Sequence, residues 1–224
     1  PRMLNKQNLK YMWPANYPGL LLLCLIFSFA GSAALLSFYI NNPAKVFLGF
    51  AAGFIAIIYN LKIFGIQLRS IKGLKAFTIA LVTIIPSIFI PIAEENIWSK
   101  IDPIGLALFS FAQFSFITAL CIGADIRDIQ EDKEDKVKSF PVVAGIQISK
   151  KFIYLLLLIQ ASLFIILYEI SFLNFKQLEL FLLVCLLSML ITNQLNSNKS
   201  YSYFIFVIDG LIMAQSTGIY LLSL

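Results

Sequence analysis

The sequence is dominated by apolar runs that are each about as long as a bilayer is thick. A transmembrane helix needs roughly 20 consecutive apolar residues, with a usual range of about 17 to 25. Seven runs in the chain meet this requirement, and short polar or charged segments separate them. The runs are residues 18–40, 44–61, 76–93, 103–124, 152–171, 178–196 and 202–222. The pattern predicts an all-α, integral membrane helical bundle that forms one domain over residues 1–224.

The small number of charged residues supports this prediction and excludes other classes. Only 13% of the residues are Asp, Glu, Lys or Arg, whereas a soluble domain has about 25%. A water-soluble fold could not cover its surface with so few polar groups. We therefore exclude a soluble enzyme, a disordered chain and a disulfide-stapled secreted module. The net charge of +5 does not indicate a nucleic-acid partner, because the basic residues are scattered between the apolar runs.

The lack of His and the placement of the Cys residues restrict the chemistry that the chain can perform. The chain has no His, so acid–base or metal chemistry must use carboxylates, Tyr, Lys or water. Cys24, Cys121 and Cys185 lie inside apolar stretches at no metal-ligand spacing. We interpret these cysteines as small buried hydrophobic residues.

Lys and Arg are distributed unequally between the two ends of the predicted helices. If the amino terminus is cytoplasmic, the inward-facing segments hold 14 of the 17 basic residues. Those segments are 1–14, 62–75, 125–151 and 197–201. Cytoplasmic loops of membrane proteins are enriched in Lys and Arg. We therefore predict a multi-pass protein whose amino terminus and longest polar loop, 125–151, are both cytoplasmic.

That loop contains the most concentrated group of acids in the chain. Six of the twelve acids fall between Asp125 and Asp135. Asp125, Asp128 and Asp132 are spaced i, i+3 and i+7, so on a continuous helix their carboxylates share one face. A cation between them would relieve their repulsion, and oxygen-only ligands suit Mg²⁺ bridged to a phosphate. The spacing leaves a solvated charged loop and a cation–diphosphate site as alternatives. Nearby cations that could hold phosphate are Arg127, Lys133, Lys136 and Lys138.

The segment DIRDIQEDKEDKVKSFPVVAG resembles the second aspartate-rich motif of the UbiA family of intramembrane prenyltransferases. That motif has the pattern D-x-x-D-x-x-x-D, followed by a basic segment, T-L-P and Gly. Asp125, Asp128 and Asp132 match the acids, and Ser139-Phe140-Pro141 replaces T-L-P. Upstream, Tyr59-Asn60-Leu61-Lys62 and Gly73-Leu74-Lys75 are similar to the family's tyrosine–lysine segment.

The resemblance implies a fold that normally has nine transmembrane helices around a central cavity. It implies Mg²⁺ as cofactor, bound with the diphosphate of an isoprenoid donor by aspartate-rich motifs. The implied activity is transfer of the prenyl chain to a hydrophobic, often aromatic, acceptor within the membrane. Asp125, Asp128 and Asp132 would be the metal ligands and catalytic acids, and Tyr59 would present its ring to the allylic cation or lie in the membrane-interface belt. The expected diphosphate ligands are Lys62, Lys75, Arg127, Lys136 and Lys138.

The sequence departs from the family at the first aspartate-rich motif, N-D-x-x-D-x-x-x-D. No acid occurs before Glu94, and the sequence starts with Pro1 where that motif would have just ended. Either two amino-terminal helices lie outside this sequence, or the lineage has replaced the motif. The second alternative predicts a catalytically degenerate relative that binds an isoprenoid or another lipid without transfer. A small transporter is a further alternative. Charged residues at the bilayer midplane would support it, and only one acid lies there.

That acid is Asp209, in the middle third of the last predicted span. An acid at this depth costs about 3 kcal/mol to insert and is usually functional or paired. It could bind the acceptor or accept a proton in the cavity. Alternatively, Asp209 joins the last helix to its neighbours by hydrogen bonding.

Overall fold

The computed structural model describes residues 47–51, 53–55, 62–63, 66–67, 71, 73–89, 92, 101–196 and 201–223. The chain divides into two compact units, Pro1–Phe47 and Leu48–Leu224. All described elements lie in the second unit, apart from Phe47 at the start of a short helical segment. The predicted span 18–40 lies outside the described residues, and the span 44–61 is described, as helix, only at 47–51 and 53–55.

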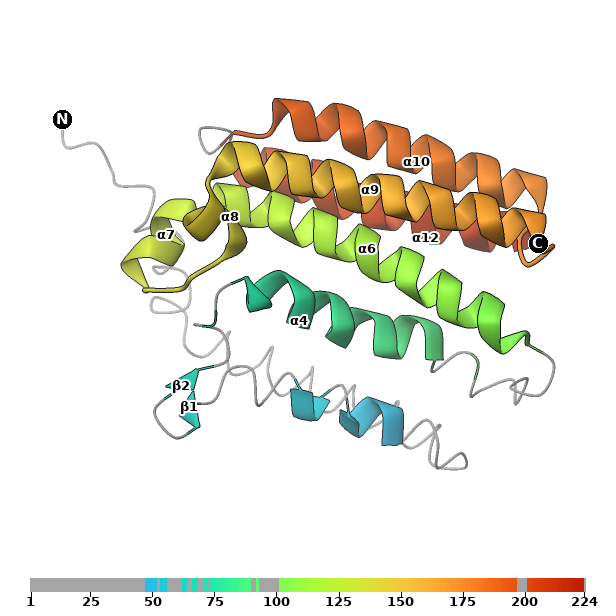
Figure 1. Cartoon of the computed structure of the whole chain (residues 1–224), viewed down its shortest axis with the longest axis horizontal. Coiled ribbons are helices and arrows are strands. Elements are labelled where there is room, and N and C mark those ends of the chain that lie inside the picture. The colour runs from blue at the N-terminus through green and yellow to red at the C-terminus, as the bar shows by residue number, and fades with distance from the viewer. Residues whose placement is uncertain are drawn as a thin grey trace, which may run out of the picture. The chain divides into compact units, whose positions relative to one another are not determined.

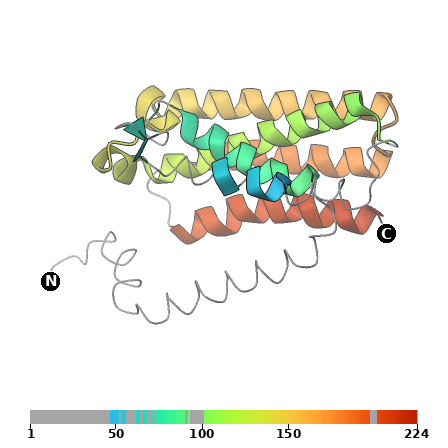
Figure 2. The same cartoon turned by 90° about the horizontal axis from the view of Figure 1, so that it is seen from below.

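Three of the described helices are long and apolar enough to cross a membrane. They are α6 (Pro103–Arg127), α9 (Ile146–Glu169) and α10 (Phe175–Gln194). The helices α6 and α9 pack on each other, as do α9 and α10, and Figures 1 and 2 show the three running side by side. Many of their Leu and Ile side chains are exposed, which suits a surface that faces lipid, because lipid tails are as apolar as these side chains.

Two shorter apolar helical segments flank these three helices. The first is α4 (Leu74–Ile84), which continues into a π-helical turn, η2 (Ile85–Phe89). Pro86 lies in that turn, where its missing N–H interrupts the regular α-helical ladder. The second comprises α11 (Tyr201–Phe204), the π-helical η3 (Ile205–Asp209) and α12 (Gly210–Ser223). Both segments correspond to predicted spans, 76–93 and 202–222.

The remaining described elements are short. α7 (Ile129–Glu134) and α8 (Phe140–Ala144) connect α6 to α9, and Figure 1 shows both at the same end of the long helices. Two-residue strands, β1 (Lys62–Ile63) and β2 (Ile66–Gln67), pair antiparallel with Lys62 opposite Gln67. This small ribbon precedes α4 and does not change the helical class of the fold.

Aromatic side chains pack together at the end of the bundle where α9 turns into α10. Phe164 of α9 stacks on Phe181 of α10 with ring centroids 3.9 Å apart, and Phe109 of α6 packs against both rings. Phe172, in the α9–α10 turn, lies so close to Gly105 that a Cβ there would collide with its ring. Because buried side chains pack at crystal-like density, Gly105 is the residue that lets α6 and this turn approach each other.

The prediction of an all-helical membrane protein is confirmed. The long helices extend past the predicted limits: α6 continues through Asp125 to Arg127, and α9 begins at Ile146 rather than at 152. Residues 125–151 are therefore largely helical and not an open loop. The number of membrane spans and the direction in which they cross stay predictions.

Candidate functional site

The candidate site is built where α6 ends and α7 begins. Asp125 lies in the last turn of α6, and Asp132 lies in the first turn of α7. Asp128 separates the two helices, with φ −89° and ψ 9°, so the chain does not continue as one straight helix. The three acids therefore do not share a single helix face as their spacing predicted. Asp125 and Asp132 are buried, at 3% and 2% exposed, whereas the side chain of Asp128 is 18% exposed.

Lys75, in the first turn of α4, connects the two buried acids. Its Nζ lies 2.8 Å from Oδ1 of Asp125. The same atom donates to Asp132, at 3.0 Å from Oδ2 and 3.1 Å from Oδ1. The start of α4 thus meets the α6–α7 junction, which is distant in sequence, at one ammonium group, and the lysine side chain itself is only 14% exposed.

The charges of this cluster do not cancel. Two carboxylates face one ammonium, and Oδ2 of Asp125 is buried without a hydrogen-bond partner among the described residues. Asp125 also lies next to the negative end of the α6 dipole. A buried charge needs pairing and hydrogen bonds to offset its lost hydration. The site therefore has capacity for further positive charge at Asp125.

Lys75 itself stays protonated in this environment. It precedes the predicted span 76–93 by one residue. Burial by itself lowers the pKa of Lys75, but the adjacent Asp125 and Asp132 carboxylates more than offset that effect and raise its pKa above 10.5. Lys75 is therefore a permanent cation in this cluster and not an acid or base at neutral pH.

Asp128 has a different partner. Arg127 Nε donates to its Oδ1 at 2.6 Å and Nη2 to its Oδ2 at 2.9 Å, which is the bidentate geometry that fits guanidinium and carboxylate. The Arg127 guanidinium also lies over the Phe204 ring, 5.7 Å from its centroid. Phe204 is not among the residues that the sequence predicts for the site. Nothing in its sequence context signals this contact, since α11 is brought to α6 only by tertiary packing.

The chain after α7 is held by backbone hydrogen bonds. Val137 N–H donates to Asp132 O and Lys136 N–H to Lys133 O, the pattern of a Schellman helix end. Lys136 takes the left-handed position with φ 57°. Just after this helix end, Lys138 O accepts a hydrogen bond from Gly73 N–H at 2.8 Å. The segment that carries Lys75 is thereby joined to the segment that follows Asp132.

The other predicted site residues are not brought into this cluster by any described contact. Lys136 and Lys138 are exposed beside it. Ser139, from the segment that replaces T-L-P, is fully buried and its hydroxyl has no partner among the described residues. Tyr59 lies outside the described residues, and for Lys62 and Asp209 the structure describes the backbone but not the side chain.

Within the described part of the chain, no three Asp, Glu or Cys side chains converge as a metal site. What converges is a pair of carboxylates, with one orphaned oxygen on Asp125. Hard divalent cations such as Mg²⁺ take one or two protein carboxylates and complete their shell with water and phosphate oxygens. Asp125 and Asp132 therefore fit Mg²⁺ as the two carboxylates that already converge.

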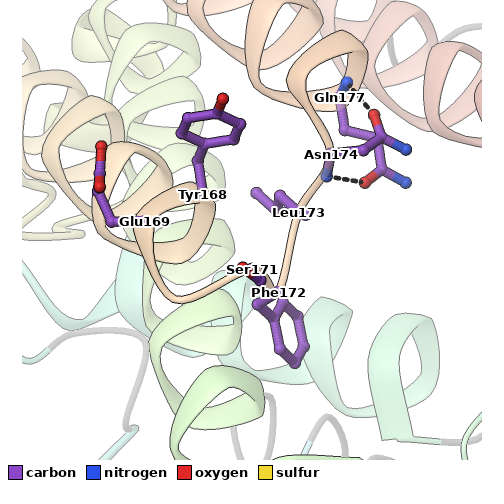
Figure 3. A pocket seen from close by; sticks show the side chains of 7 residues that line it. All are labelled: Tyr168, Glu169, Ser171, Phe172, Leu173, Asn174 and Gln177. Carbon is purple, nitrogen blue, oxygen red and sulfur yellow. Dashed lines mark hydrogen bonds between the residues drawn. The ribbon is translucent and has the colours of Figure 1, made fainter.

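A pocket of about 560 Å³ lies at the opposite end of α9, around the turn to α10. Figure 3 shows Tyr168 and Glu169 on one side and the capping pair Asn174 and Gln177 on the other. Asn174 and Gln177 satisfy each other's backbone N–H groups. Glu169 is the only charged residue in the lining, so the pocket lacks the grouped charges of the α6–α7 site.

The fold and the site together define a helical membrane protein with an acid–lysine cluster at the end of a spanning helix. The family described as the UbiA prenyltransferase family matches residues 18–204. The chain therefore belongs to the UbiA prenyltransferase family, and the resemblance noted in the sequence is confirmed. Members of this family are in general transferases of prenyl groups that work in a lipid bilayer. No curated protein and no solved structure matches the chain significantly.

Proposed function

We propose that this protein transfers an isoprenoid chain from a prenyl diphosphate to a hydrophobic, aromatic acceptor within the membrane, with Mg²⁺ as cofactor. One observation supports this more than any other: Lys75, Asp125 and Asp132 meet at the end of α6 in a chain of this family. Carboxylates, a permanent cation and a buried setting are what binding of a metal–diphosphate complex requires.

Asp125 and Asp132 would hold the metal ion through their oxygens, with Asp128 as a third ligand if it leaves Arg127. The ion would supply positive charge to neutralise the departing diphosphate. Lys75, Arg127, Lys136 and Lys138 would add hydrogen bonds and charge to the phosphate oxygens, together with Lys62 from β1. These residues lie at one end of the helices, so the polar head of the donor would be bound there and its prenyl chain would extend among the apolar helices.

In the reaction, the allylic C–O bond to diphosphate breaks and the bonding electron pair leaves with pyrophosphate. The allylic carbocation forms a new bond with the acceptor, which then loses a proton. Aromatic faces can stabilise the cation, and Tyr59 is the candidate for this role. The helical bundle limits water around the cation, which protects it from hydrolysis. Asp209 is a candidate for binding the acceptor or accepting its proton.

The direct test measures binding and turnover on the full chain in lipid nanodiscs. We expect geranyl or farnesyl diphosphate to bind in the presence of Mg²⁺ and to lose affinity when EDTA removes the metal. Release of pyrophosphate should require both Mg²⁺ and an added aromatic acceptor. If no prenyl diphosphate binds in Mg²⁺, the proposal is wrong.

A catalytically degenerate relative is the second candidate, favoured by Lys75, whose ammonium group already pairs with both buried acids. Such a protein would bind an isoprenoid or another lipid without transfer. The same assay separates the two candidates. Binding of the donor without pyrophosphate release across a panel of acceptors would support the degenerate relative.

A further inference from the structure

Lys75 occupies the position between two carboxylates that a metal ion would also occupy. Its Nζ lies 2.8 Å from Asp125 and 3.0 Å from Asp132, so both acids already direct oxygens at one cationic point. An ammonium group and a divalent cation repel each other strongly at such short range in a buried setting. Lys75 and the metal therefore compete for the same two carboxylates.

The backbone around Lys75 is fixed while its side chain is long and flexible. Gly73 N–H is bonded to Lys138 O, and Leu74 N–H to Ile71 O, which anchors the start of α4. A lysine side chain has four rotatable bonds beyond this anchor. The ammonium group can therefore leave the carboxylates without any movement of α4, α6 or α7.

Arg127 is more restricted than Lys75. Its guanidinium makes two hydrogen bonds to Asp128 and lies over the Phe204 ring. Lys75 makes all its described polar contacts with the two buried acids. Of the cations with described contacts at the site, Lys75 is thus the one placed to exchange with an incoming ion.

We propose that Lys75 is an exchangeable counter-ion. Before the metal arrives, its ammonium group neutralises part of the charge on Asp125 and Asp132. When a divalent cation binds the two carboxylates, the ammonium group swings away and donates to the diphosphate that accompanies the metal. This inference rests on the proposed function. It adds that the metal binds weakly by itself and tightly together with diphosphate.

The test is a titration of the full chain in nanodiscs with Mn²⁺, whose free concentration is read by electron paramagnetic resonance. Without phosphate, Lys75→Met should bind Mn²⁺ at least about tenfold more tightly than the wild type, because a repelling charge is gone. Two variants serve as controls: Lys75→Arg keeps the charge, and Lys151→Met removes an exposed lysine outside the site. Neither control should bind Mn²⁺ more tightly than the wild type. With inorganic pyrophosphate added, the advantage of Lys75→Met should disappear.

A second measurement uses the wild type and needs no stable variant. Lysine reactivity with acetic anhydride, followed by mass spectrometry, reports whether Lys75 is held by the acids. Saturating Mg²⁺ without phosphate should increase acetylation of Lys75 several-fold relative to Lys151 in the same sample. Unchanged acetylation of Lys75 at saturating Mg²⁺ would overturn the counter-ion inference.

The failures of the two proposals are distinguishable. If folded Lys75→Met binds Mn²⁺ no better than the wild type, while pyrophosphate still promotes Mn²⁺ binding to both, the exchange is wrong and the proposed function stands. If neither protein binds Mn²⁺ even with pyrophosphate, both proposals are wrong.

Discussion

At the scale of single residues, burial separates the acids of the α6–α7 region into two groups. Asp125 and Asp132 are almost inaccessible, whereas Glu134 and Asp135 are exposed. Asp132 lies in the first turn of α7, but that helix has only six residues, so its dipole contributes little. The interaction with Lys75 is therefore what retains these two carboxylates inside the protein, and it directs them toward the same point.

The first prediction concerns Asp132. Asp132→Asn preserves the shape of the side chain but removes the charge that would hold the metal–diphosphate complex, so prenyl transfer should fall by about 100-fold or more. Pyrophosphate release in nanodiscs is the measurement. Glu179→Gln is the matched control, because Glu179 is an exposed acid on α10. Activity of Asp132→Asn within threefold of the wild type would contradict a role for this carboxylate.

At the scale of elements, the ends of the helices are specified by local chemistry. α6 begins with Asp102, whose carboxylate accepts from the N–H groups of Ile104 and Gly105, followed by Pro103 at the first helical position. α9 ends in a Schellman motif, with Phe172 N–H bonded to Leu167 O and Ser171 N–H to Tyr168 O. These two ends meet where Phe172 packs against Gly105.

The second prediction tests the cap of α6. Asp102→Ala removes both hydrogen bonds to the first turn, so the free energy of unfolding should fall by about 0.5–2 kcal/mol. Asp102→Asn retains a side-chain acceptor and should lose much less. Thermal or denaturant unfolding in detergent micelles measures the difference. Equal losses for the two variants would show that capping does not account for the effect.

The third prediction tests the end of α9. Ser171 has φ 60°, a left-handed conformation that costs a residue with a Cβ about 1 kcal/mol. Ser171→Gly should therefore stabilise the protein by about 0.5–1 kcal/mol, measured by the same unfolding experiment. Ser171→Ala keeps the Cβ and serves as the control. If Ser171→Gly is no more stable than Ser171→Ala, the strain at this position is negligible.

The helices could be predicted from the sequence, and the geometry of the site only in part. Apolar runs of bilayer length predict α6, α9 and α10 because burial in lipid depends on local hydrophobicity. The break at Asp128 was missed, since the i, i+3, i+7 spacing suggests one continuous helix. The spacing does not predict that Lys75 bridges Asp125 and Asp132 either. Lys75 precedes Asp132 by 57 positions in the sequence, and only tertiary packing brings it to the two acids.

At the scale of the whole molecule, the two ends of the bundle differ in chemistry. The end formed by α7 and α8 carries exposed Lys133, Lys136 and Lys138, and at the other end of α9 the first turn of α10 carries Lys176. Such asymmetry orients membrane proteins with their basic end in the cytoplasm. The proposed metal–diphosphate site would then open to the cytoplasmic side, where a soluble diphosphate head group could reach it.

The last prediction tests this orientation in a background in which Cys24, Cys121 and Cys185 are changed to Ala. Lys136→Cys is exposed beside the site, and Ser171→Cys is exposed in the turn at the far end of α9. A membrane-impermeant maleimide should label Lys136→Cys only in inside-out vesicles and Ser171→Cys only in right-side-out vesicles, because a full helix of 24 residues separates the two ends. Labelling of both positions from one side would mean that α9 does not cross the bilayer. The reverse pattern would place the acid–lysine cluster outside the cytoplasm, where the donor would have to be supplied from the other side of the membrane.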